Sequence, residues 1–137
     1  MFKKIMVAVD LEHQEKAEKA IAMAADLAKQ YGAEALMVGV TGTGFSRAAP
    51  LLEKYFNELD AFTKEQSGKH GVDFTPTPVV CADPAAELHG MLLDEIEKQD
   101  ADLLVMGSHK PGMLDYLLGG HAGHMATHAP ISVLVVR

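Results

Sequence analysis

Apolar residues follow two patterns that alternate from one end of the chain to the other. Short runs rich in Val, Ile, Leu and Met are typical of strands that are covered on both faces, as in a parallel sheet. Such runs recur along the sequence with longer, more polar segments between them. They predict strands at Lys4–Val9, Ala35–Val40, Asp73–Cys81, Leu103–Met106 and Ser132–Val136.

Between these runs, apolar residues recur every three or four positions, which predicts amphipathic helices. Gly32 stands where a glycine commonly ends a helix. Asp83 followed by Pro84 is a helix-start signal, because aspartate caps the first N–H groups and proline fits the first turn. The predicted helices are Glu15–Tyr31, Pro50–Lys69, a third that starts at Asp83–Pro84 and contains Ile96, and Gly120–Thr127.

This alternation of strands and helices predicts an α/β fold in a single domain over residues 1–137. We expect a five-stranded open parallel sheet in the order 3-2-1-4-5, with helices on both faces. Pro76 and Pro78 cannot donate to a ladder, so the third strand belongs at an edge. In this order the sheet reverses between the first and fourth strands, where such sheets bind ligands. Asp10 and Gly107 would then face each other there.

Charge and composition exclude several classes of partner. The formal net charge is −7 and the chain has no basic run, so we expect no nucleic-acid partner. No apolar run approaches the roughly 18 residues that cross a bilayer, so we expect no membrane partner. The single cysteine, Cys81, excludes an internal disulfide and fits a reducing compartment, which predicts a cytoplasmic protein.

The segment Asp102–Ala122 carries the strongest functional signal. An apolar strand is followed by a loop with Ser108, His109 and Lys110, then by the pair Gly119–Gly120 at a predicted helix start. The first N–H groups of a helix have no partner within it, and glycine allows a ligand to approach the backbone closely. This segment therefore predicts a cradle for the phosphates of a nucleotide.

Several motifs together resemble the universal stress protein family over nearly the whole chain. The Gly-Ser-His-Lys-Pro loop that runs into Tyr-Leu-Leu-Gly is most similar to a short-loop bacterial subgroup. The resemblance implies the Rossmann-like fold known as adenine nucleotide alpha hydrolase-like, and a homodimer; some family members bind ATP and others do not. The motifs are Lys4–Asp10, Asp83–Pro84, Met106–His109, Tyr116–Gly119, and His128–Pro130 before Val133–Val136.

The resemblance also carries ATP-binding positions onto this chain. Gly107 and Gly119 match two glycines of the phosphate motif, Lys110 replaces another, and Asp10 matches an acid beside the base. Gly120 replaces a hydroxyl residue, which removes one hydrogen bond worth about 0.5–1.5 kcal/mol. The implied site for ATP, with or without Mg²⁺, comprises Ala8, Val9, Asp10, Val40, Met106, Gly107, Ser108, His109, Lys110, Gly119, Gly120, His121 and Ala122.

Simpler explanations exist for several of these residues. Each glycine can be a turn residue that needs a positive φ, Asp10 can cap the helix that follows, and Lys110 can be a solvated loop residue. His121, His124 and His128 fall on one face of a helix, which raises the alternative of a transition-metal site. No cysteine or carboxylate stands next to them in the sequence, so we predict no metal ligands.

We predict a stress-response sensor or adaptor with an unknown protein partner. The sequence holds neither a Gly-x-Ser-x-Gly elbow nor a Walker lysine–serine pair, so we expect at most slow ATP hydrolysis. The apolar last strand, Ser132–Val136, predicts a homodimer through a sheet edge. Two alternatives remain open: a dimeric stress protein that binds no nucleotide, and a metal-responsive protein that uses the histidines.

Overall fold

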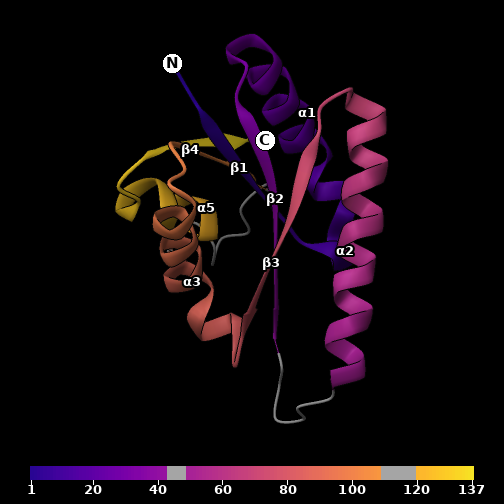
Figure 1. Ribbon diagram of the computed structural model, residues 1–137. Helices are drawn as coiled ribbons and strands as arrows, with labels where there is room; N and C mark the ends of the chain where they lie inside the picture. Colours follow the sequence, from indigo (N-terminus) through magenta and orange to yellow (C-terminus); the bar gives the residue numbers. More distant parts are fainter. Residues whose placement is uncertain (43–48, 109–119) are drawn as a thin grey trace.

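The computed structural model describes residues 1–42, 49–108 and 120–137 (Figure 1). Strands and helices alternate along these segments, as the apolar pattern predicts. The elements are β1 Lys4–Val9, the short 3₁₀ helix η1 Leu11–His13, α1 Gln14–Tyr31, β2 Glu34–Gly42, α2 Ala49–His70, β3 Phe74–Cys81, α3 Pro84–Gln99, β4 Leu103–Gly107, α5 Gly120–His128 and β5 Ser132–Val136.

The five strands form one parallel sheet in the order β3-β2-β1-β4-β5, which confirms the predicted fold class and strand order. β1 lies in the centre, where Ile5 pairs with Leu103 of β4 on one side and with Ala35 of β2 on the other. β3 is an edge strand, as Pro76 and Pro78 require.

Two apolar cores lie on opposite faces of the sheet, because successive strand residues point to opposite sides. α1 and α2 cover one face, and α3 and α5 cover the other (Figure 1). Ile5 and Val7 of β1 pack under α1 and α2 with Leu59, whereas Met6 packs under α3 and α5 with Met125. Neighbouring residues of one strand therefore pack in different cores.

The predicted second strand was too short. β2 continues past Val40 because Thr41 and Gly42 still pair with the end of β3. The turn η1 was not predicted, since its three residues show no apolar pattern. The other predicted bounds agree with the observed ones to within one residue, and Gly32 ends α1 with φ +62° as expected. Across the described segments, no helix is both long and apolar enough to cross a membrane.

Candidate functional site

The candidate site lies where β1 and β4 meet, at the carboxyl ends of the strands. Ala8 pairs in register with Met106, so Asp10 and Ser108 follow these strands at the same edge of the sheet. The backbone N–H of Ser108 donates to the carbonyl oxygen of Val136 at 2.8 Å, which ties the end of β4 to β5. The strand order thus reverses at the point where the sequence predicts a ligand.

Four predicted site residues lie on the face covered by α3 and α5. Ala8, Val40, Met106 and Ala122 all belong to or pack against the core under these helices. Val9 does not join them, because its buried side chain packs in the opposite core. The predicted set mixed the two faces, since residues 8 and 9 are neighbours in sequence but point to opposite sides of β1.

Gly107 is explained by a close approach of helix α1. A Cβ atom at this position would lie 2.7 Å from the carbonyl oxygen of Lys16 in α1, where backbone cannot move aside cheaply. Within the described residues, the glycines with positive φ are Gly32, Gly71 and Gly120. A positive φ is therefore not the reason for glycine at position 107, where the close approach of α1 is. Gly120 does have a positive φ of +50°, as the simpler explanation proposed.

The start of α5 presents the predicted phosphate end of the site. Gly120 and His121 are exposed, whereas Ala122 is buried beneath them in the core under α3 and α5. The first backbone N–H groups of a helix point along its axis and favour an anion. His109, Lys110 and Gly119 lie outside the described residues.

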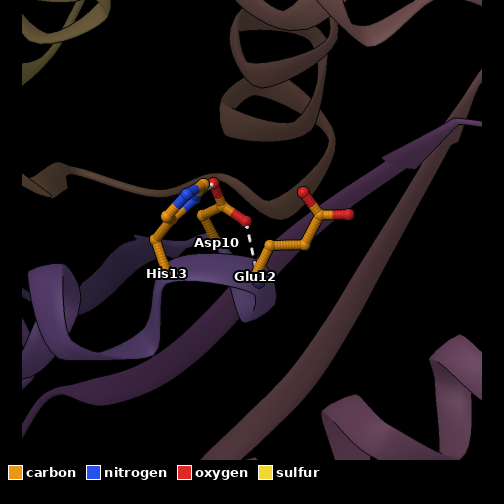
Figure 2. Close-up of side chains that lie close together, drawn as sticks. All are labelled: Asp10, Glu12 and His13. Atoms are coloured by element: carbon orange, nitrogen blue, oxygen red, sulfur yellow. Dashed lines mark hydrogen bonds and ion pairs between the residues drawn. The ribbon is translucent and has the colours of Figure 1, made fainter.

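Asp10 holds the short helix that follows β1 (Figure 2). Its Oδ1 accepts a hydrogen bond from the backbone N–H of Glu12 at 3.0 Å, and its Oδ2 lies 2.9 Å from Nδ1 of His13. Asp10 is therefore an N-cap, as the simpler explanation proposed. The carboxylate remains exposed at the edge of the sheet, so capping does not exclude contact with a ligand.

Asp10, Glu12 and His13 bring three potential metal-ligand atoms within 4.8 Å of one another. Such a group does not fit Mg²⁺, which prefers six oxygen ligands, because imidazole nitrogen is a poor ligand for this ion. Both oxygens of Asp10 also accept hydrogen bonds from its own helix. We therefore derive no role for Mg²⁺ from these residues.

Tyr55 of α2 carries a polar group near this edge and packs against the core under α1 and α2. Its hydroxyl is buried, without a hydrogen-bond partner among the described residues, and lies against Gly39 of β2. Burial raises the pKa of Tyr55 to about 12, and the negative charges of Asp10 and Glu58 act in the same direction. The phenol is thus neutral, and Asp10 is close enough to influence it.

A cluster of imidazoles lies between α3 and α5. Nε2 of His89 lies 2.8 Å from Nδ1 of His121, and the ring of His89 stacks on His124 with centroids 3.9 Å apart. His128 stacks on His124 in turn, at 4.1 Å. Partial burial lowers the pKa of His89, and its three histidine neighbours lower it further. His89 was not among the predicted candidates, because it lies on a different helix from the other three histidines.

A family model described as the universal stress protein family matches residues 1–137. This chain belongs to the universal stress protein family. Universal stress protein G of Salmonella typhimurium is 30% identical over 142 residues, covering 100% of both chains. The family assignment and the Rossmann-like fold that the resemblance implied are therefore confirmed.

Solved universal stress proteins share the fold at lower identity. One, in complex with cAMP, gives a TM-score of 0.77 at 21% identity and covers 99% of this chain and 97% of that one. Another, from Archaeoglobus fulgidus in complex with dAMP, gives 0.74 at 20% identity and covers 98% of each chain.

Proposed function

We propose that this universal stress protein binds ATP where β1 meets β4 and acts as a cytoplasmic sensor or adaptor in the stress response. Ala8, Val40 and Met106 would contact the base from the face under α3 and α5. The backbone N–H groups from Gly119 to Ala122 would bind the phosphates, with Lys110 balancing their charge. Asp10 would lie beside the base and ribose.

One observation carries this proposal: Ala8, Val40, Met106 and Ala122 share one face of the sheet beside the start of α5. An apolar patch next to a helix start suits a molecule with an aromatic ring and an anionic end. The two structural neighbours described above were solved with cAMP and dAMP, which supports an adenine nucleotide as the ligand class.

Binding rather than efficient catalysis is the better fit to these residues. Hydrolysis needs a group that positions water against the γ-phosphate. Three residues of the proposed site could take this role: Asp10, His109 and His121. Asp10 is engaged as an N-cap, His121 lies against His89, and His109 lies outside the described residues. A sensor would signal through its nucleotide state, and a homodimer through β5 would present two such sites.

The test is to denature freshly purified protein, identify any released nucleotide, and titrate the stripped protein with ATP, AMP and adenosine by calorimetry. Lys110→Ala should weaken ATP binding at least tenfold, because a charged phosphate contact contributes about 1.5–3 kcal/mol. Adenosine binding should not change. The matched control is Lys3→Ala, which removes an equal charge before β1, at the opposite end of the sheet.

Absence of released nucleotide together with absence of binding heat would overturn the proposal. It would favour the second candidate, a dimeric stress protein that acts through protein contacts alone, which the loss of a hydroxyl at Gly120 supports. Sedimentation analysis over a range of concentrations tests the dimer separately. A monomer at every concentration would contradict pairing through β5.

A further inference from the structure

The imidazole cluster between α3 and α5 brings together two ring nitrogens from different helices. Nε2 of His89 on α3 and Nδ1 of His121 on α5 are 2.8 Å apart. Two nitrogens at this distance share one proton, so at least one of them presents a lone pair to the other. A divalent metal ion can take the place of that shared proton.

The separation needs only a small change to accommodate a metal. Zinc–nitrogen bonds of about 2.0–2.1 Å at a tetrahedral angle place two nitrogens about 3.3–3.4 Å apart. The two imidazoles would have to separate by roughly half an ångström. His121 is exposed and His89 is half-buried at the protein surface, so an ion has access and the side chains have room.

A third imidazole lies against this pair. His124 stacks on His89 with an angle of 11° between the rings, and it follows His121 by three positions on α5. Residues three apart on a helix share one face, so both project toward His89. In the stack the nitrogens of His124 do not converge with those of the pair, so His124 would have to leave the stack to become a third ligand.

We propose that His89, His121 and His124 form a binding site for a divalent late transition-metal ion, with zinc as its reference ligand. Imidazole nitrogens favour Zn²⁺, Cu²⁺ and Ni²⁺ over Mg²⁺ and Ca²⁺. The sequence predicted no metal ligands, because no cysteine or carboxylate stands next to the histidines of α5; this proposal departs from that prediction by adding His89 from a second helix. The site does not depend on the proposed nucleotide function.

His128 has a different position in the cluster. Its Nδ1 hydrogen-bonds the carbonyl oxygen of His124 at 2.9 Å, and its ring covers the outer side of His124. We therefore assign His128 no ligand role, because it holds His124 in the stack from which His124 would have to move to reach the ion.

The experiment is a calorimetric titration of chelator-treated full-length protein with Zn²⁺, and Cu²⁺ electron paramagnetic resonance to detect nitrogen ligands. His89→Gln keeps size and polarity while removing the ligand, and should weaken zinc binding at least tenfold, since even outer-sphere changes cost about 10–100-fold. His121→Ala should have a similar effect. Mg²⁺ in excess should not compete.

Two matched variants distinguish this site from other places on the chain where zinc could bind. His13→Ala removes the imidazole from the Asp10, Glu12 and His13 group, and should leave zinc affinity unchanged. His128→Ala should reduce affinity less than His89→Gln. Equal zinc binding by wild type and His89→Gln would overturn the proposal. So would a loss caused by His13→Ala. A loss in His128→Ala as large as that in His89→Gln would make His128 a ligand and overturn the proposed ligand set.

Discussion

The two helix pairs that cover the sheet are joined in opposite ways. Between α1 and α2, Nζ of Lys69 lies 2.8 Å from Oε1 of Glu18, so unlike charges meet. Their contact lowers the pKa of Glu18 and raises that of Lys69. Between α3 and α5, imidazole meets imidazole, and burial together with the neighbouring histidines lowers the pKa of His89. The first junction therefore keeps its charges when the pH falls through the range of histidine, whereas the second contains a group, His89, that is harder to protonate in the folded chain.

The largest expected effect contrasts a glycine that packs against α1 with a glycine on α5 that has free space around it. Gly107→Ala should lower the free energy of unfolding by about 1–3 kcal/mol, because the new Cβ would meet the Lys16 carbonyl oxygen of α1. Gly123→Ala on α5 meets no atom within 4 Å and should raise stability by up to about 1 kcal/mol. Urea denaturation measures both. Equal effects of the two variants would contradict the contrast.

Acidification should weaken one junction and spare the other. The pKa of His89 lies below its ordinary 6.5, so the unfolded chain binds more protons between the two values. The contribution of neutral His89 to the free energy of unfolding is therefore fully present above pH 6.5 and is lost as the pH drops below it. Glu18, with a pKa below 4.5, stays charged in that range. Hydrogen exchange of metal-free protein at about pH 7 and pH 5.5 should show α3 and α5 losing protection before α1 and α2.

A control variant isolates the histidine contribution to this acid effect. His89→Gln removes the group whose pKa is lowered. The free energy of unfolding of this variant should therefore fall less between pH 7 and pH 5 than that of the wild type. If α1 and α2 lose protection as early as α3 and α5, protonation of the cluster is not the cause.

The smallest expected effect concerns the charged junction. Lys69→Met removes the contact between α1 and α2 and should lower the urea midpoint slightly, because both partners are exposed and solvent screens them. The loss should shrink further in high salt. Lys54→Met is the control, since Lys54 pairs with Glu58 within α2 and joins no second helix. An equal change in both variants would mean that bridging two helices adds nothing.

Sequence alone predicted the fold well, for a physical reason. A strand buried on both faces, such as Leu103–Met106, must be apolar throughout, and a helix on a sheet must have an apolar stripe, so both signals are local. Proline at positions 76 and 78 excluded an interior strand for the same local reason. These rules determine the elements and much of their order.

The candidate site was harder to predict, because contacts between elements are not local. His89 and His121 are 32 positions apart, and only the packing of α3 beside α5 brings them together. The need for glycine at 107 likewise depends on where α1 crosses β4. Val9 is a different case: the two-residue period of a strand already places it on the face opposite Ala8. Ligand binding by the predicted residues stays a prediction.

The two edges of the sheet differ in whether they can accept another strand. At β3, Pro76 and Pro78 stand two positions apart and lack N–H groups, so the outer side of this strand cannot donate there. β5 carries no proline and keeps its donors. A strand from a second copy can therefore add at β5 but finds a poor template at β3. If two copies pair at β5 as proposed, growth by edge pairing would stop at two copies, and this asymmetry would keep the protein from polymerising into fibres.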